Sequence, residues 1–519
     1  MLFNLSLTET HLQYDLPTPP ESVATRYQLT SNSIHDDNED AQNVSISNWT
    51  LTDFAHGYEL YLPRHSVNVI TWQHQTVMPT PTATATSTAT PSATSTLTAT
   101  STPTATSTPT ATSTPTATST PSATSTPTAT STPTPIATNT STPTITLTPS
   151  GATSHYVCDC NANADGDCVA GDDNNDASTA NTPWRTYEKA RTEFGNLLAG
   201  STIQFCRGGA FDLTSSNDEW VNYNCTAANP CTVGDYTPPW ASGDEARPIL
   251  TKSSDGHVFA LADRGNADPD GGYIFQNLDL RCTVCDSTNG WGFFLYNDVD
   301  DVLIENVRLD GFDIGVHLAG SNACSSDPEC NGMNDRITVR NATIINSPSQ
   351  GLLGAGDGLI IESSYFEKNG YGSTRDHNIY VSHAENVRIS GNELYRSSLN
   401  EQGRCGGTSL VAHGVMANLV IENNLVREDI GFAEQACWGI ALDLGYSTPE
   451  QFDNLIIRGN QVVNVGNVAI GSTSCVNCLI ENNVIIHEQD FGVTAIAVPN
   501  KSRASDDAET TNVTRQRQP

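Results

Sequence analysis

A short pattern of residues recurs through the second half of the chain. The stretches NVRISGNELY from Asn386, NLVIENNLV from Asn418, NLIIRGNQVV from Asn454 and CLIENNVII from Cys478 are nearly the same. Aligned on an Ile/Val-x-x-Asn-x-apolar core, the repeats place one equivalent position every 22 to 36 residues, at Leu278, Val307, Ala342, Ser364, Asn392, Asn424, Asn460 and Asn483. Self-similarity at such a period is typical of a solenoid, in which each repeat packs only on its neighbours.

Each repeat is composed of short alternating runs and not of a helical pattern. One unit contains IYVS, VRIS and ELY, and another contains GIALDL, LIIRG and QVV. Three short strands per turn, rich in Ile, Val and Leu and separated by Gly and Asn, predict an all-β fold, the right-handed parallel β-helix. Ile389, Ile421, Ile457 and Ile480 are then expected to point inward and to stack from coil to coil.

The asparagines at the bends of the repeat are predicted to be structural. An asparagine side chain can hydrogen-bond the backbone where a strand turns, and asparagine tolerates left-handed backbone geometry. This interpretation applies to Asn341, Asn392, Asn424 and Asn460.

The open end of a solenoid needs a cap, and the stretch NTPWRTYEKARTEFGNLL from Asn181 predicts one. Thr182 suits the N-cap of a helix and Pro183 its first position. The apolar residues that share one face of this helix are Trp184, Tyr187, Phe194 and Leu197. We expect the helix to close the N-terminal mouth of the β-helix.

A segment of unusual composition, residues 76–150, divides the chain. It is dominated by TSTPTA repeated with a period of six, contains no charged residue, and has a proline in nearly every repeat. Such a segment cannot bury a core and is predicted to be a disordered, extended linker, whose Thr and Ser beside Pro suit O-glycosylation. The predicted domains are therefore residues 1–75, the linker, a β-helix over 151–498 and a disordered tail over 499–519.

The region before the linker is predicted to be a small β-sandwich. The stretch YELYLPRHSVNVITW, residues 58–72, is typical of two strands joined by a turn, and VATRYQLT from Val23 of another strand. This region resembles the C-terminal β-sandwich that closes many retaining glycosidases, such as arabinofuranosidases. The resemblance implies that residues 1–75 are the tail of a larger enzyme; a stand-alone sandwich is the alternative.

Composition narrows the set of partners. The 519 residues include 58 Asp and Glu but 24 Lys and Arg, which gives a formal charge of −34. Such a polyanion is not expected to bind nucleic acid or an anionic membrane through bulk electrostatics. No apolar run approaches the length of a membrane span, so we do not expect membrane insertion.

The cysteines point to an oxidising compartment. All fourteen follow residue 150, and four pairs are closely spaced: Cys225 and Cys231, Cys282 and Cys285, Cys324 and Cys330, and Cys475 and Cys478. Short disulfides and a four-cysteine zinc site are both possible interpretations, and we favour disulfides because each pair can close its own loop. The start MLFNLSLTET lacks the features of a signal peptide. We therefore expect a secreted protein whose signal peptide is missing from this sequence.

The entrance to the predicted β-helix resembles a known group of proteins. The stretches GDDNNDASTANTPWRTYEKA, GSTIQFCRGGAF, TVGDYTPPW and ARPILTK are similar to the start of secreted parallel β-helix proteins of the pectate-lyase and chondroitinase B-like superfamily. The resemblance covers residues 151 to about 498. It implies a carbohydrate-active protein, but the superfamily includes lyases, hydrolases, epimerases and non-catalytic binders.

The stretch KNGYGSTRDHNIYVSH, residues 368–383, holds the densest set of acids and bases in the domain. It resembles the His-x-Ile-Tyr coil of β-helix enzymes. The residues predicted to be catalytic are Lys368, Arg375, Asp376 and His377. If GVHL from Gly315, NIYV from Asn378 and GIAL from Gly439 are equivalent strands, an outward column forms a sugar-binding groove. The predicted substrate-binding residues are His317, Tyr380, His383 and Asp443; ordinary solvated positions are the alternative.

The predicted partner is a polysaccharide, bound by a monomeric protein. Elimination of a uronate needs a cation to neutralise the carboxylate and a base for the C5 proton. Hydrolysis needs two suitably spaced carboxylates. The sequence offers candidates for a polysaccharide lyase and for a glycosidase, and a non-catalytic glycan-binding or adhesion module remains the other class.

A calcium site is a further candidate in NANADGDCVAGD, residues 161–172. Asn161, Asn163, Asp165 and Asp172 occupy positions 1, 3, 5 and 12 of a loop like that of an EF-hand. Asp replaces the usual glutamate at the last position and no flanking helices are evident. A solvated acidic loop tied by disulfides is the alternative.

Overall fold

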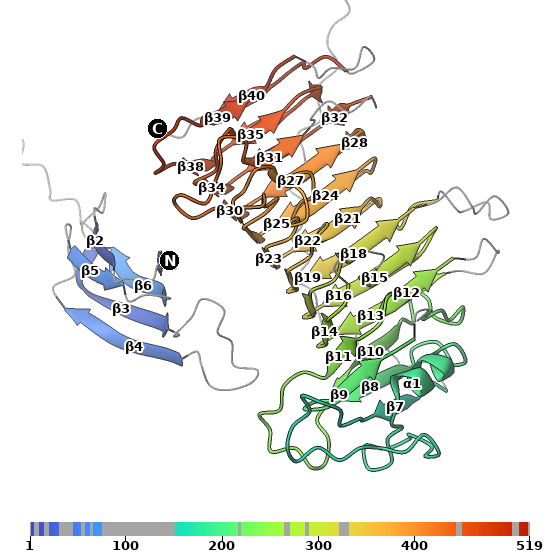
Figure 1. The fold of residues 1–519 in the computed structure, drawn as a ribbon. Helices are drawn as coiled ribbons and strands as arrows, with labels where there is room; N and C mark the ends of the chain where they lie inside the picture. Colours follow the sequence, from blue (N-terminus) through green and yellow to red (C-terminus); the bar gives the residue numbers. More distant parts are fainter. Residues whose placement is uncertain are drawn as a thin grey trace, which may run out of the picture. The chain divides into compact units, whose positions relative to one another are not determined.

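The computed structural model describes residues 151–215, 219–263, 270–285, 290–320, 332–442, 449–500 and 508–516, and the backbone of six strands before residue 75 (Figure 1). The described chain falls into two compact units. The predicted linker and the turn at residues 63–65 lie outside the described residues.

The N-terminal unit contains two small sheets. The six strands are β1 (Leu2–Asn4), β2 (Thr10–Tyr14), β3 (Pro20–Thr30), β4 (Ser45–Thr52), β5 (Tyr58–Leu62) and β6 (Ser66–His74). One sheet has the order β1-β6-β3-β4, and β2 pairs with β5 in antiparallel fashion. The two strands predicted within residues 58–72 are therefore present, but they belong to different sheets.

The second unit is a right-handed parallel β-helix, as predicted. Its described strands form sheets of twelve, ten, nine and three strands, and successive strands of each sheet pair in parallel. The twelve-stranded sheet consists of β7 (Ser154–Val157), β8 (Thr202–Cys206), β10 (Cys231–Tyr236), β13 (Gly271–Gln276), β16 (Asp300–Glu305), β19 (Thr338–Arg340), β22 (Ile360–Glu362), β25 (Arg388–Ser390), β29 (Val420–Glu422), β33 (Ile456–Arg458), β37 (Leu479–Glu481) and β40 (Thr514–Gln516). The ten-stranded sheet consists of β9 (Ala210–Leu213), β11 (Ile249–Lys252), β14 (Asp279–Cys282), β17 (Arg308–Asp310), β20 (Thr343–Ile345), β23 (Tyr365–Glu367), β26 (Glu393–Tyr395), β30 (Leu425–Arg427), β34 (Gln461–Val463) and β38 (Val484–Ile486).

The remaining two sheets complete each coil. The nine-stranded sheet consists of β12 (Phe259–Ala262), β15 (Trp291–Tyr296), β18 (Ile314–Ala319), β21 (Leu352–Gly354), β24 (Ile379–Ser382), β27 (Thr408–His413), β31 (Trp438–Leu442), β35 (Val468–Ser472) and β39 (Thr494–Ala497). The three-stranded sheet consists of β28 (Val415–Ala417), β32 (Gln451–Asp453) and β36 (Cys475–Val476). Among the described residues, no helix has the length and apolar character needed to cross a lipid bilayer.

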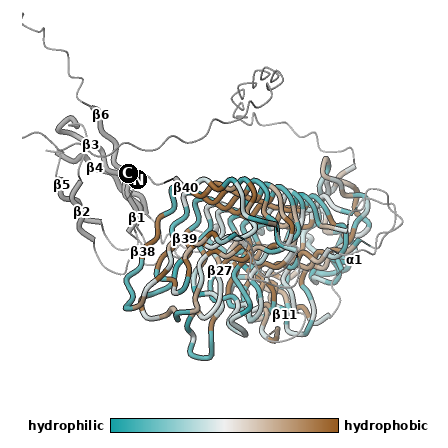
Figure 2. The backbone as a smooth tube through the Cα atoms, turned by 90° about the horizontal axis from the view of Figure 1, so that it is seen from above, coloured by the Kyte–Doolittle hydropathy of each residue, from teal (hydrophilic) through white to brown (hydrophobic). Residues whose placement is uncertain are grey.

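Apolar side chains stack along the inside of the β-helix. Ile389, Ile421, Ile457 and Ile480 pair in register from β25 to β37 and are buried, as predicted. Figure 2 shows hydrophobic residues recurring from coil to coil. Each coil therefore adds apolar area that only its neighbours can cover, and burial of that area is the main stabilising contribution.

A ladder of buried asparagines joins successive coils. The Oδ1 atom of Asn424 accepts the backbone N–H of Asn392 at 2.9 Å, and Oδ1 of Asn460 accepts that of Asn424 at 3.0 Å. The amide of Asn424 donates to the carbonyl of Ile389 at 2.9 Å. The predicted structural role is confirmed for Asn392, Asn424 and Asn460, whereas Asn341 is exposed, has a φ of 52° and lies outside the ladder, at the bend before Ala342. The left-handed φ, however, falls on the preceding residue, as at Asn423 with φ 57°, because the residue in the ladder must keep its side chain inside.

The capping helix is shorter than predicted. Helix α1 spans Tyr187–Phe194, and its N-cap is Thr186, whose side chain accepts the N–H of Lys189 at 3.1 Å. The prediction of Thr182 as N-cap is wrong, because the backbone around Trp184 pairs with β7 instead of turning into the helix. The predicted apolar face is buried: Tyr187 stacks near Phe205, and the other buried residues are Trp184, Phe194 and Leu197.

Disulfides tie the loops, and no described cysteine is free. The six described disulfides are Cys158–Cys206, Cys160–Cys168, Cys225–Cys231, Cys282–Cys285, Cys405–Cys437 and Cys475–Cys478. Three of the four predicted close pairs are therefore confirmed, and the fourth, Cys324 and Cys330, lies outside the described residues.

The C-terminal tail differs from the prediction of disorder in its described part. Strand β40 pairs with β37, and the N–H of Thr511 donates to the carbonyl of Cys475 at 2.8 Å. The β-helix thus continues beyond residue 498, because the edge of β37 offers backbone groups that a further strand can pair.

Candidate active site on the nine-stranded sheet

Long connections gather beside one sheet. From β13 onward, the turns from the twelve-stranded to the ten-stranded sheet are short, as at residues 306–307, whereas residues 368–378, 396–407 and 428–437 form longer connections that lead into the nine-stranded sheet. Binding and catalytic groups concentrate on loops held by a rigid scaffold. The outer face of the nine-stranded sheet is therefore the best candidate for a functional surface.

The strand register places His317 and Tyr380 in one outward column. His317 pairs with Leu353, which in turn pairs with Tyr380. The repeat alignment predicted this equivalence. Asp443, predicted for the same face, lies outside the described residues.

The outer face is accessible along only part of the sheet. Outward residues from β15 to β24, such as Phe294, His317 and Tyr380, are partly exposed. On β27 the outward residues Val411 and His413 are buried. A ligand on this face would therefore lie over β15, β18, β21 and β24.

Two aspartates occupy equivalent positions at the entrance to these strands. Val316, Leu352 and Ile379 pair with one another across β18, β21 and β24. Asp313, Ser349 and Asp376 each precede those residues by three positions. The two carboxyl groups therefore belong to coils separated by a single coil, which corresponds to about 10 Å between their backbones.

The neighbours of the two aspartates differ. The hydroxyl of Ser349 donates to Oδ1 of Asp313 at 2.7 Å. The amide of Gln350 donates to Oδ1 of Asp376 at 3.0 Å, and its Oε1 accepts the N–H of His377 at 2.7 Å. Residues 349 and 350 thus orient both carboxylates from the coil between them.

Burial raises the pKa of Asp376, and the negative charge of Asp313 raises it further, while the hydrogen bond from Gln350 opposes the shift. The pair therefore has one carboxyl group that retains its proton to a higher pH than an ordinary aspartate. A carboxylic acid beside a second carboxylate is the arrangement that general acid–base hydrolysis requires.

The other residues predicted to be catalytic lie in different surroundings. His377 is buried, and its Nδ1 atom donates to the carbonyl of Thr408 at 2.7 Å. Lys368 is exposed at the turn after β23, at the far end of the loop from Asp376, and Arg375 is exposed. A catalytic role for Lys368, Arg375 and His377 remains a prediction.

A second group of polar residues surrounds Tyr380. The Nδ1 atom of His413 lies 3.1 Å from Oε1 of Glu450, and both side chains are buried. The ring centroids of Tyr380 and His413 are 5.4 Å apart. His383 is exposed after β24 and packs against Gly414, where an added Cβ would lie 2.5 Å from its ring. Tyr380 thus packs beside the buried His413 at the edge of the accessible face.

A hollow of about 480 Å³ lies among three of the loops, lined by residues that include Arg404, Ile430, Glu434 and Phe491. Arg404 and Glu434 form an ion pair at 3.3 Å, and both side chains are largely exposed. Charges that are hydrated and already paired are weak candidates for chemistry.

The predicted calcium ligands lie on a loop closed by the Cys160–Cys168 disulfide. Asp165 accepts the N–H of Asp167 at 2.9 Å, and Asp172 accepts that of Asn174 at 2.9 Å. Asn161 donates to Asp159, and Asn163 has a left-handed φ of 78°. Calcium binding by Asn161, Asn163, Asp165 and Asp172 remains a prediction.

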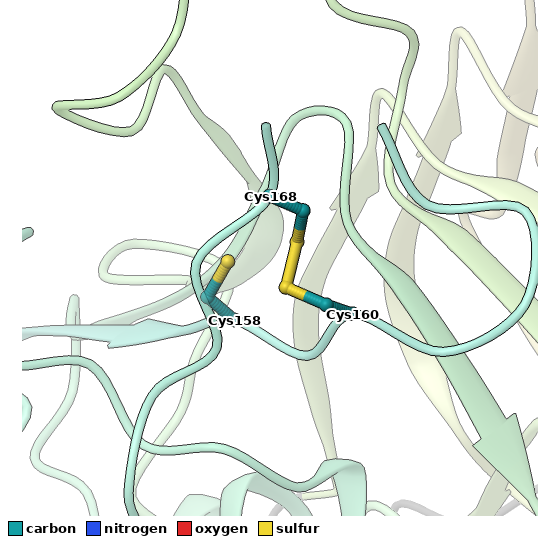
Figure 3. Close-up of side chains that lie close together, drawn as sticks. All are labelled: Cys158, Cys160 and Cys168. Atoms are coloured by element: carbon teal, nitrogen blue, oxygen red, sulfur yellow. A yellow bond between two sulfur atoms is a disulfide. The ribbon is translucent and has the colours of Figure 1, made fainter. Parts of the chain in front are cut away.

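The sulfur atoms of Cys158, Cys160 and Cys168 lie close together (Figure 3). All three are disulfide-bonded, Cys158 to Cys206 and Cys160 to Cys168. Metals bind the thiolate form of cysteine, so this group is not available as a ligand set in the oxidised protein.

Asp313 and Gln350 were missed by the sequence analysis. The alignment of Gly315 with Asn378 already makes Asp313 equivalent to Asp376, so the repeat itself could have identified Asp313 as a candidate. Gln350 carried no such signal, because its position beside Asp376 depends on how adjacent coils stack.

No family model and no curated protein matches the chain. Among solved structures, it is similar to a GH136 lacto-N-biosidase from Eubacterium ramulus, with 13% identity, 67% of each chain covered and a TM-score of 0.45. It is also similar to an alginate lyase from Paenibacillus sp. str. FPU-7, with 12% identity, 66% of this chain and 99% of that chain covered, and a TM-score of 0.32. A third is DFA-IIIase from Arthrobacter chlorophenolicus A6 in complex with DFA-III, with 11% identity, coverage of 63% and 90%, and a TM-score of 0.39.

Proposed function

We propose that the β-helix is a secreted glycoside hydrolase that cleaves a polysaccharide on the outer face of its nine-stranded sheet. Asp376 is the general acid and Asp313 the general base. The observation that carries the proposal is the equivalent placement of these two aspartates, together with the raised pKa of Asp376.

The proposed reaction consists of two proton transfers. The protonated carboxyl of Asp376 donates its proton to the glycosidic oxygen as the bond from that oxygen to C1 breaks. The carboxylate of Asp313 takes a proton from a water molecule whose oxygen forms the new bond to C1. Proton exchange with solvent then restores both groups.

The spacing favours inversion at C1. The two backbones are about 10 Å apart across two strand spacings. Inverting enzymes separate their carboxyl groups by about 6.5 to 9.5 Å to admit water, whereas retaining enzymes need about 5 to 5.5 Å. The spacing of Asp313 and Asp376 along the β-helix therefore supports an inverting mechanism, which needs the wider separation.

The disulfides support action outside the cell, where such bonds persist. An enzyme in that location meets polysaccharides as extended chains, and the accessible face over β15, β18, β21 and β24 is open to such a substrate. No part of the mechanism requires a metal ion.

The test is a screen of neutral and acidic polysaccharides for new reducing ends, with NMR of the first anomer released. Asp376→Asn and Asp313→Asn should each reduce turnover by at least a hundredfold, and Glu385→Gln, at an exposed residue after β24, serves as the control. An unsaturated product that absorbs in the near ultraviolet would show that the enzyme is a lyase and not a hydrolase. Binding of a polysaccharide without any product would show that the protein is a glycan-binding or adhesion module.

A further inference from the structure

Five ring side chains form a cluster on the outer face of the nine-stranded sheet. We call them the aromatic–histidine cluster: His257, Trp291, Phe294, Tyr296 and His317. The rings of His257 and Trp291 stack at 4.5 Å with an interplanar angle of 14°, and Trp291 meets His317 edge-on at 4.5 Å. The ring centroid of Phe294 lies 4.3 Å from that of Trp291 and 5.6 Å from that of Tyr296.

The cluster adjoins the proposed carboxylate pair. Trp291 pairs with Ile314, the residue that follows Asp313. The N–H of Asp313 donates to the carbonyl of Gly290 at 2.8 Å. A chain bound over Asp313 and extended along the β-helix axis would therefore reach Trp291 in the neighbouring coil.

The polar atoms of the cluster are not explained by packing. Within the described chain, His257 Nδ1, Trp291 Nε1 and His317 Nδ1 are covered and have no hydrogen-bond partner. A buried unpaired polar atom costs about 1 to 3 kcal/mol. A layer that only covered the sheet would use apolar side chains, as Val411 does on β27. The rings are thus retained at a cost to stability.

We propose that the aromatic–histidine cluster is a subsite that binds a pyranose ring of a neutral glycan, next to the point of cleavage. The inference rests on the proposed function. Rings of this kind offer flat apolar faces to the C–H groups of a sugar and polar edges to its hydroxyls.

The tautomers of the two histidines suit this ligand. A covered Nδ1 atom without a partner is better left as a lone pair than as an N–H, so the proton belongs on Nε2. That Nε2 proton is the one that each histidine would donate to a sugar hydroxyl.

The charges near the cluster select against an acidic glycan. Burial lowers the pKa of His257 and of His317 to about 4, so both rings are neutral near pH 7. Lys252, whose charge acts on His257, is itself buried, and its ammonium donates to the carbonyl of Ser215. Asp313 adds negative charge beside the rings. The exposed Arg375 belongs to the coil of Asp376, two strands along the sheet from His317.

The test uses the full chain carrying Asp376→Asn, which separates binding from cleavage. Calorimetry measures the affinity for hexaoses of glucose, xylose, mannose and N-acetylglucosamine, and for oligogalacturonate and oligoalginate. We expect one or more neutral hexaoses to bind. Tyr296→Ala and His317→Leu should weaken that binding at least tenfold, and Leu already occupies the next position of the column at Leu353.

The matched control is Phe432→Ala, because Phe432 is 40% exposed and Tyr296 39% exposed. It should leave the affinity unchanged. Binding of acidic oligosaccharides alone, no binding of any neutral hexaose, or equal affinity of the Tyr296→Ala variant would overturn the inference. Binding that depends on the cluster in a protein without hydrolytic activity would overturn the proposed function and leave this subsite standing.

Discussion

Asp313 and Asp376 occupy the same position of two coils, and the coil between them contributes Ser349 to one carboxylate and Gln350 to the other. The solenoid thus arranges an acid and a base that lie far apart in the chain, simply by stacking equivalent residues. The one coil between them sets their backbones about 10 Å apart, and its Ser349 and Gln350 side chains fix the direction of the two carboxyl groups.

The pH profile of the reaction should respond to Gln350. Its amide stabilises the ionised form of Asp376, so Gln350→Met should raise the pKa of that carboxyl further. A hydrogen bond with a net value of about 1 kcal/mol corresponds to about 0.7 pH unit. The alkaline limb of kcat/KM should move upward by that amount. Ser349→Ala, which removes a donor to Asp313, should leave the alkaline limb in place; a limb that moves equally in both variants would speak against Asp376 as the acid.

The asparagine ladder should contribute strongly to stability. Asn424→Ala removes the acceptor for the N–H of Asn392 and the donor to the carbonyl of Ile389, both in the interior. We expect the free energy of unfolding to fall by about 2 to 3 kcal/mol, as measured by urea titration. The exposed Asn196→Ala should change it by less than about 0.5 kcal/mol. Equal effects of the two substitutions would contradict the structural role of the ladder.

The disulfide between Cys405 and Cys437 joins two loops of neighbouring coils, and its cysteines are 32 positions apart in the sequence. Replacing both by Ser should lower the free energy of unfolding by about 3 to 4 kcal/mol on chain-entropy grounds. Replacing Cys160 and Cys168, which are 8 positions apart in the sequence, should lower the free energy of unfolding by about 1 kcal/mol less than the first replacement does. Thiol titration of the unreduced protein should find these four cysteines unreactive, and a reactive thiol at any of them would count against the export argument.

Acid should destabilise the β-helix through His377. Burial lowers the pKa of this residue to about 4, from an ordinary value of 6.5. Between those values the unfolded chain binds a proton that the folded chain does not, so stability falls as the pH drops from 6.5 to 4 and this contribution then levels off. The loss is on the order of 3 kcal/mol. In His377→Gln, the free energy of unfolding should depend less steeply on pH over this range, by the equivalent of about one proton. Denaturant titrations at several pH values measure this slope, and an unchanged slope would contradict the role of His377.

The periodic apolar residues determined the architecture by themselves. Ile389, Ile421 and Ile457 recur at strand positions whose only way of leaving water is to stack on one another, so the repeat specified a β-helix. The same local logic predicted close disulfides such as Cys282–Cys285, because the two cysteines are neighbours in any loop. Where a competing contact existed, local signals failed: Thr182 suits an N-cap, but the pairing of Trp184 with β7 delayed the helix to Thr186.

The candidate site depended on tertiary structure more than the architecture did. Alternation along a strand separates inward from outward residues, and it placed His317 and Tyr380 in one column. It does not say how far a side chain is buried or which loop lies over it. Only the stacking of three coils put Gln350 against Asp376 and turned His377 inward to Thr408, because those contacts join residues 26 and 31 positions apart in the chain. Periodicity is a property of the sequence, whereas desolvation and charge proximity, which set the acidity of Asp376, exist only once the coils have packed.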